Sequence, residues 1–552
     1  MTRVKSGHAW IVSATVVAGI LALLMTIFAP NFAQAGDDGV AMTYESALFA
    51  ADSVMEIDVL IDSDNWESLL RTAINEDYYA CDVQVNATLF RNVAIRAKGN
   101  TSLSSIASDP TTDRYSFKIE FDHYDEGQSC FGLDKLVLNN QYADATNMKE
   151  AIVYDMFAYL DADASLYQYA KLSINGTYWG VYLALEAVEE RFLLRNYGAA
   201  AGELYKPEGV TGERGSGADG ATLNYTDDEL DSYQTIWDGA VTDSDKSDHR
   251  RVVSALKQIA AHGNPESVLD VDNLLRYMAV HTFAVNLDSL SGSMAHNYYL
   301  YEQDGKLNLI PWDYNLAWGG FSQGGMDASD TVNFPIDTPF AANISMRDRL
   351  FFAALLENEN DLAQYHAYLR QLCEYVTDGT LQSVYQRIRS QIDSLVASDP
   401  TAFYSYEEYA TAAEMLLAVL ARRAESVSGQ LNGSIPSTHE AQQNASAALV
   451  DASDLDLSVM GTMQTGNANG NAPGESRKPD QAPDDLSESD DFGTPPDGNA
   501  PGGFGQPDSL PTEAGANRKG SESNGTVTWI WLGISFIALI AGIGFAKAFR
   551  RR

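Results

Sequence analysis

The chain has 552 residues, which is long for one ordinary domain and allows several parts. Hydrophobic residues make up 45% and aromatic residues 10%, so the composition excludes a wholly disordered or collagen-like chain. The 36 Lys and Arg residues against 76 Asp and Glu residues give a formal net charge of −40. This charge argues against a nucleic-acid-binding protein, because phosphate groups bind to basic surfaces.

The N-terminus has the pattern of a secretory signal peptide, which we predict over residues 1–35. A basic start precedes an apolar run from Trp10 to Phe28, and Ala33-Gln34-Ala35 is a small-x-small cleavage motif. An uncleaved membrane anchor is the alternative, because the apolar run is long. With so few cysteines a disulfide scaffold is excluded, although Cys81 and Cys130 could pair outside the cell.

Residues 40–430 carry the periodic apolar patterns of a globular body. The alternation of apolar residues from Met55 to Ile61 predicts a β-strand with one buried face. Apolar positions at helical spacing between Ile152 and Leu160 predict one helix in this front part. Further short strands are predicted over residues 81–89, 92–98, 115–122, 133–138, 168–174 and 179–186.

Beyond residue 230 the patterns become mostly helical, and one hairpin interrupts them near 297–303 and 307–311. Helices are predicted over residues 249–262, 270–287, 346–377, 380–397 and 405–430. A β-rich part with one helix, followed by a helical part with one inserted hairpin, is the outline of a kinase-like bilobal fold. The predicted class is therefore α+β, with a β-rich N-lobe and a mostly helical C-lobe.

The composition changes after the body. Residues 431–525 are rich in Pro, Gly, Asn, Ser and Asp and predict a disordered acidic stalk, because they cannot bury enough apolar area. Residues 527–546 are apolar over the length of one bilayer crossing and predict a transmembrane helix. The basic tail 547–552 should stay cytoplasmic, which predicts a single-pass cell-membrane protein with an extracellular N-terminal domain.

Three polar residues lie around the predicted hairpin. Asp288 follows the end of a predicted helix, Asn297 opens the first strand, and Asp313 lies just past the second. Because a hairpin brings its two ends together, these side chains should meet at one mouth. Two carboxylates and an amide suit Mg²⁺, and phosphoryl transfer uses such a set. The alternative is that each residue only caps a turn or opens a strand.

With these motifs, the sequence resembles the spore coat protein H (CotH) kinase family. The resemblance covers roughly residues 50–375. The matching stretches, in family order, are Arg96–Ser102, Tyr115–Asp122, Leu136–Asn140, Asp144 with Met148–Glu150, Gly180–Glu186, Gly202–Pro207, Asp288–Gly319 and Phe334–Pro339.

The resemblance implies an atypical cell-surface protein kinase that uses ATP with Mg²⁺ or Mn²⁺ and phosphorylates Ser in envelope or coat proteins. By the family pattern Asp288 would be the catalytic residue, and Asn297 and Asp313 the metal ligands. After Asp313 many family members have a second acid where this chain has Asn315, which leaves the number of metal ions open. A literal Asp491-Phe492-Gly493 lies in the predicted stalk and is rejected as a kinase motif.

The nucleotide side is predicted from fewer signals. Lys118 in a strand and Glu150 in the following helix imitate the strand-Lys to helix-Glu pair of kinases. Lys98 ends a strand before a glycine and is a candidate for phosphate contact, although this stretch could instead only turn the chain. Glu186 ends the last front strand where an adenine hinge would lie, and Lys206 is another phosphate candidate. A solvated strand lysine is the alternative for Lys118.

Two other functions remain open at this stage. A surface adhesin or interaction module could keep the fold without turnover, and the predicted stalk and anchor suit it equally well. A metal-dependent hydrolase fits less well, because the cluster lacks His and paired acids for two metals. His281 and His296 are interpreted as structural, since no second His lies at ligand spacing.

Overall fold

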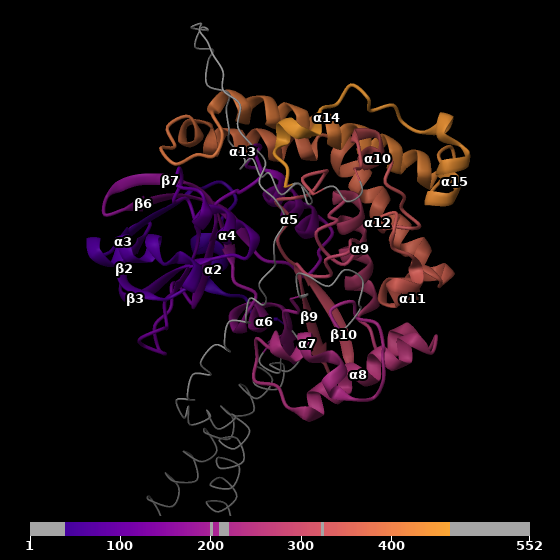
Figure 1. The fold of residues 1–552 in the computed structure, drawn as a ribbon, viewed down its shortest axis with the longest axis horizontal. Coiled ribbons are helices and arrows are strands. Elements are labelled where there is room, and N and C mark those ends of the chain that lie inside the picture. The colour runs from indigo at the N-terminus through magenta and orange to yellow at the C-terminus, as the bar shows by residue number, and fades with distance from the viewer. Residues whose placement is uncertain (1–38, 199–201, 209–219, 322–324, 464–552) are drawn as a thin grey trace, which may run out of the picture. The chain divides into compact units, whose positions relative to one another are not determined.

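The computed structural model describes residues 39–198, 202–208, 220–321 and 325–463 (Figure 1). The predicted signal peptide, the transmembrane segment 527–546, the basic tail and the stalk beyond residue 463 lie outside the described residues. Within the described ranges the front of the chain is rich in strands and the rest is mostly helical, which confirms the prediction of a mixed α+β protein with this order.

Seven strands of the front part close into a barrel in the order β1-β2-β3-β4-β5-β7-β6. Neighbours run antiparallel except β1 and β6, which are parallel. The strands are β1 (Met55–Leu60), β2 (Tyr79–Val85), β3 (Thr88–Lys98), β4 (Ser116–Glu120), β5 (Lys135–Asn139), β6 (Tyr167–Ile174) and β7 (Thr177–Glu186). The helices of this part are α2 (Thr43–Leu48), α3 (Ser63–Arg71), α4 (Thr101–Ser108), α5 (Lys149–Tyr159) and α6 (Glu190–Tyr197).

Side chains alternate along each strand, so every second side chain points out of the barrel. On β4, Phe117 and Ile119 are fully buried in the barrel interior, so Lys118 between them points outward. On β5, Val137 points outward too, and it belongs to the hydrophobic core that α5 shares with the helical part. The outer face of β3, β4 and β5 is therefore the face on which polar residues meet α5.

The rest of the chain supplies a small antiparallel sheet and a set of long helices. The sheet has the order β10-β9-β8, and its β9–β10 hairpin confirms the predicted one. Its strands are β8 (Glu203–Tyr205), β9 (Tyr298–Gln303) and β10 (Lys306–Pro311). The helices are α7 (Gln234–Asp238), α8 (Lys246–Ala260), α9 (Val271–Ala284), α10 (Ala328–Val332), α11 (Leu350–Leu356), α12 (Glu359–Thr377), α13 (Thr380–Val396), α14 (Tyr406–Leu431) and α15 (His439–Asn444).

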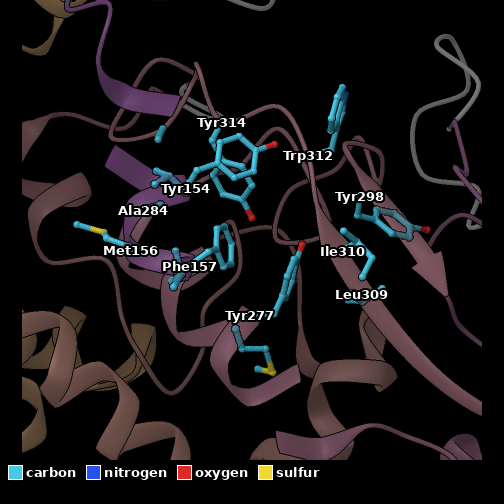
Figure 2. Close-up of a cluster of buried hydrophobic side chains, with 14 of the residues drawn as sticks. Tyr154, Met156, Phe157, Tyr277, Ala284, Tyr298, Leu309, Ile310, Trp312 and Tyr314 are labelled. Atoms are coloured by element: carbon cyan, nitrogen blue, oxygen red, sulfur yellow. The ribbon is translucent and has the colours of Figure 1, made fainter. Parts of the chain in front are cut away.

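An aromatic cluster joins α5 to the helical part (Figure 2). Phe157 of α5 packs edge-on against Tyr314 with ring centroids 5.5 Å apart and stacks on Tyr277 of α9 at 6.0 Å. Tyr154 of α5 contacts the same Tyr314 ring at 6.5 Å. Since Tyr314 directly follows Asp313, this packing holds α5 close to the end of β10.

The packed body extends beyond the predicted boundary at residue 430. Asp337 donates its N–H to the Ser437 carbonyl at 2.9 Å, and Ala145 donates to the Met460 carbonyl at 3.1 Å. Ala452 and Met460 are completely buried. The predicted start of the stalk at residue 431 is corrected accordingly. The segment has no apolar periodicity because it buries single residues against a surface that the rest of the chain supplies.

The structure bears on two further predictions. Cys81, Cys130 and Cys373 are all buried and all free, so the bridge considered between Cys81 and Cys130 is not formed. Over the ranges that the structure describes, no helix combines the length and the apolar character needed to cross a membrane.

Candidate active site

The Asp288 carboxylate is held from two sides in the loop between α9 and β9. His296 Nε2 lies 2.9 Å from Asp288 Oδ1, and Asn297 Nδ2 donates to Asp288 Oδ2 at 3.0 Å. The Asn297 amide also donates to the Asp288 carbonyl at 2.9 Å. This arrangement fixes the direction of the carboxylate and leaves the Asn297 amide oxygen available to a ligand.

His296 was not predicted to act at this site. Burial lowers the pKa of its imidazole, but the hydrogen bond and the charge of Asp288 outweigh it, and the pKa is raised. The sequence feature that could have indicated this role is its position directly before Asn297. The other histidine, His281, is structural as predicted: it is buried, with hydrogen bonds to Tyr314 (3.0 Å) and Ser291 (2.7 Å).

Asp313 follows β10 with a left-handed backbone (φ 62°). Its carbonyl accepts a hydrogen bond from Asn286 Nδ2 at 3.4 Å, whereas its carboxylate has no hydrogen-bond partner in the part of the chain that the structure describes. Burial raises the pKa of Asp313, Lys98 lowers it, and Asp288 raises it, with a net raised value. Asp313 is therefore close to both Asp288 and Lys98 and lacks a committed partner.

Lys98 and Glu150 meet through an amide. Lys98 Nζ donates to Asn139 Oδ1 at 3.0 Å, and Asn139 Nδ2 donates to Glu150 Oε2 at 2.8 Å. Glu150 is 1% exposed, and its Oε1 has no hydrogen-bond partner among the described residues. Burial and Asp313 raise the pKa of Glu150 to about 8. Burial also lowers the pKa of Lys98, although Asp313 opposes this.

The predicted pair of Lys118 and Glu150 is not formed. Lys118 makes an ion pair with Glu189, which also binds Lys135 at 2.6 Å. Lys118 and Lys98 both lie on the outer face of the barrel, but only Lys98 ends its strand beside α5. Asn139, which links Lys98 to Glu150, was missed because its role depends on the barrel register.

The other two predicted nucleotide residues differ from each other. Glu186 is completely buried, and its carboxylate accepts hydrogen bonds from Tyr44 (2.5 Å) and from Arg195 (2.6 and 2.9 Å), so its side chain is occupied within the fold. Lys206 pairs with Glu208 at 2.7 Å and lies over the Tyr299 ring at 5.9 Å. It also lowers the pKa of Asp313, which puts it in the electrostatic environment of the site.

A buried arginine supports the Asp288 loop. Arg349, which is 4% exposed, donates from Nε to the Leu290 carbonyl at 2.6 Å and from Nη2 to the Gly292 carbonyl at 2.5 Å. These bonds fix the backbone just after Asp288. Nothing in the sequence around Arg349 pointed to this role, because its partners lie about 60 residues earlier in the chain.

The side chains of Asp288, Asn297 and Asp313 supply some, but not all, of the ligands that a hard divalent cation needs. Within the described ranges no group of three His, Cys, Asp or Glu residues is placed to hold a metal ion. The oxygen donors near one another are the carboxylate of Asp288 and the side chain of Asn297, which are hydrogen-bonded, and the carboxylate of Asp313, whose pKa the Asp288 charge affects. Because the Asp313 carboxylate accepts no hydrogen bond from the described residues, it could bind a cation whose remaining ligands come from phosphate and water, as Mg²⁺ prefers.

Comparison with known proteins agrees with the resemblance drawn from the motifs. The CotH kinase protein family matches residues 95–427, and the chain belongs to this family, which indicates a kinase-like protein. The inner spore coat protein H of Bacillus subtilis (strain 168) is 28% identical over 203 residues, 36% of this chain. The match spans 54% of that relative, so only about half of its length is represented.

A solved structure shares part of its length with this chain. It is the complex of the Shewanella oneidensis MR-1 toxin–antitoxin proteins HipA and HipB with operator DNA. The alignment covers 58% of the present chain and 59% of the matched chain in that complex. The TM-score of 0.26 and the 12% identity are too low to bear on the fold.

The predicted location in a cell membrane is corrected. The relative is named as a spore coat protein, and no described helix is suited to crossing a bilayer. The predicted span, 527–546, lies outside the described residues.

Proposed function

We propose that this chain is a metal-dependent atypical protein kinase that transfers the γ-phosphoryl group of ATP to Ser of a coat or envelope protein. The observation that carries the proposal is the meeting of Asp288, Asn297 and Asp313 with Lys98 and Glu150. These residues come from the barrel, from α5 and from both ends of the β9–β10 hairpin. Family membership and the name of the coat-protein relative support the reaction and the class of substrate.

The residues divide into three roles. Asp313 and Asn297 would hold Mg²⁺ or Mn²⁺, which neutralises charge on the phosphates when it is bound. Lys98, kept in place by Asn139, and Lys206 supply cations for the phosphate oxygens. Asp288, oriented by His296 and by the Asn297 amide, accepts the hydrogen bond of the Ser hydroxyl and directs its oxygen toward the γ-phosphorus.

The experiment compares wild type with Asp313→Asn and Asp288→Asn. Asp313→Asn should weaken Mg-ATP binding and lower transfer together, on the order of 10²-fold or more, because phosphoryl charge is stabilised mainly through the metal. Asp288→Asn should retain nucleotide and metal and lose transfer, because only the acceptor hydroxyl loses its orientation. Calorimetric titration of Mg-ATP and mass spectrometry for phosphoserine measure the two effects.

Asp304→Asn is the matched control. Asp304 lies in the turn of the same hairpin, is exposed, and has a left-handed backbone that Asn tolerates. It should behave as wild type. A wild-type protein that neither binds nucleotide nor labels any protein would refute the kinase proposal and leave the interaction-module alternative.

A further inference from the structure

The first turn of α5 is polar, buried and held by several bonds. Lys149 and Glu150 are 0% and 1% exposed. Asp144 Oδ2 accepts the Lys149 backbone N–H at 3.0 Å, and Asp144 Oδ1 accepts the Thr146 N–H at 2.9 Å. The direction of Glu150, and through Asn139 that of Lys98, therefore depends on how this turn is fixed.

Two of the bonds that fix this turn come from far along the chain. We call residues Asp456–Met463 the C-terminal strap. Its Met460 carbonyl accepts the Ala145 N–H at 3.1 Å, and its Gly461 carbonyl accepts a hydrogen bond from Lys149 Nζ at 3.2 Å. In Figure 1 the strap is the yellow segment that returns from α15 toward α5.

Gly461 is required for this close approach. Its φ is 80°, and a Cβ at this position would lie 2.5 Å from the Ala143 carbonyl oxygen and 2.9 Å from Tyr404 Oη. Any side chain here would be strained and would push the strap away from α5. Met460 beside it is completely buried, so the docking is both apolar and hydrogen-bonded.

The strap also contacts the segment that follows Asp313. Met463 donates its N–H to the Gly320 carbonyl at 2.6 Å. Leu457 packs directly against Gly319, because a Cβ added to Gly319 would lie only 2.6 Å from Leu457 Cδ1. Within that segment Asn315 Nδ2 donates to the Tyr142 carbonyl at 2.7 Å. The strap therefore bonds to both segments that carry the site acids, although none of its residues takes part in the site.

From these contacts we infer that the C-terminal strap is a positioning element for phosphoryl transfer, with Gly461 as its key residue. It fixes α5 against the segment after Asp313, and so sets the relative position of Glu150, Lys98 and Asp313. The inference rests on the proposed kinase function for its effect on activity. Its structural part, the coupling of the strap to α5, is independent of that function.

The test uses Gly461→Ala in the full chain, with Gly433→Ala as the matched control. Gly433 has a similar positive φ (78°), but a Cβ there meets nothing within 4 Å. Both substitutions put a side chain on a backbone with positive φ, and only at Gly461 would the added Cβ meet neighbouring atoms and disturb the docking. Asp456→Ala is a milder second variant, because Asp456 accepts the Ser458 N–H at 3.0 Å and so caps the turn of the strap.

Two quantities are measured well below the melting temperature: transfer of phosphate from ATP, and amide hydrogen exchange of residues 142–152. Gly461→Ala should lower kcat/KM on the order of 10- to 10²-fold and speed exchange in this segment. Asp456→Ala should do the same more weakly, and Gly433→Ala should do neither.

Two results would overturn the inference. One is unchanged exchange at residues 142–152 in Gly461→Ala, whether or not the wild type transfers phosphate. The other is an equal effect of Gly433→Ala, which would mean a general loss of stability. If the wild type transfers no phosphate but exchange rises only in Gly461→Ala, the kinase proposal fails and the coupling of the strap to α5 stands.

Discussion

Two charged groups lie on the outer face of the same barrel, and they differ in how their charges are balanced. In the first, Glu189 binds both Lys118 and Lys135, and burial, which raises the pKa of Glu189, is outweighed by these two lysines. In the second, Lys98 is bound to a neutral amide, and one buried carboxylate oxygen of Glu150 has no hydrogen-bond partner in the described ranges.

The difference separates a structural ion-pair network from a site that awaits a ligand. A buried charge that is not compensated costs stability, and folds retain such groups mainly where a ligand completes them. The Lys118 group is complete in itself. The Lys98 group lies beside Asp313, whose carboxylate has no partner in the described part of the chain, so anionic phosphates and a cation would complete it.

The largest expected effect is on catalysis and compares the two lysines directly. Lys98→Met should lower phosphoryl transfer on the order of 10²-fold, because a phosphate contact is lost from the site. Lys118→Met should leave transfer unchanged, since Glu189 still binds Lys135. Transfer rates at saturating ATP, with thermal melting as a control for folding, measure the difference. Equal losses in both variants would remove the distinction between the groups.

A second expected effect concerns the support of α5, which carries only one of the two groups. Ending the chain after Leu431 instead of Met463 removes the acceptors of the Ala145 N–H and of the buried Lys149 ammonium. Each unsatisfied buried group costs about 1–3 kcal/mol, so the shorter chain should be less stable by several kcal/mol in denaturant unfolding. Equal stability of the two chains would show that the segment contributes nothing to the body.

A third expected effect is a pH dependence of stability. Burial and Asp313 raise the pKa of Glu150 from 4.5 to about 8, so the folded state binds more protons than the unfolded state between these values. The free energy of unfolding therefore falls as pH rises through this window. The fall is about 1.4 kcal/mol for each pH unit over which the folded state holds one proton more than the unfolded state. Glu150→Gln should remove this fall and gain stability over wild type from pH 5 to pH 8.

Glu189→Gln is the control for this prediction. Burial raises the pKa of Glu189, but Lys118 and Lys135 lower it by more, so the net pKa is below 4.5. Its contribution to stability is present above pH 4.5 and is lost only as the pH falls below it. Glu189→Gln should therefore be less stable than wild type by a constant amount from pH 5 to pH 8. Chemical unfolding across this range measures both variants.

The sequence was most informative where the chemistry is local. The β9–β10 hairpin predicted that Asp288, Asn297 and Asp313 meet, because a hairpin returns the chain to its starting point, and the structure joins Asp288 to Asn297 directly and places Asp313 near them. Whether these residues act as proposed remains a prediction. The β-rich front and the helical remainder followed from period-2 and period-3.6 patterns.

What the sequence by itself determined is the order of the elements, the family and the residues at the ends of one hairpin. Only the tertiary structure decided that Lys98 rather than Lys118 meets Glu150, because both lysines share one face and only Lys98 lies beside Asn139, which binds Glu150. It also decided the roles of His296, Arg349 and the C-terminal strap. Their partners lie at distances along the chain that no periodicity records, so only the packed fold brings them together.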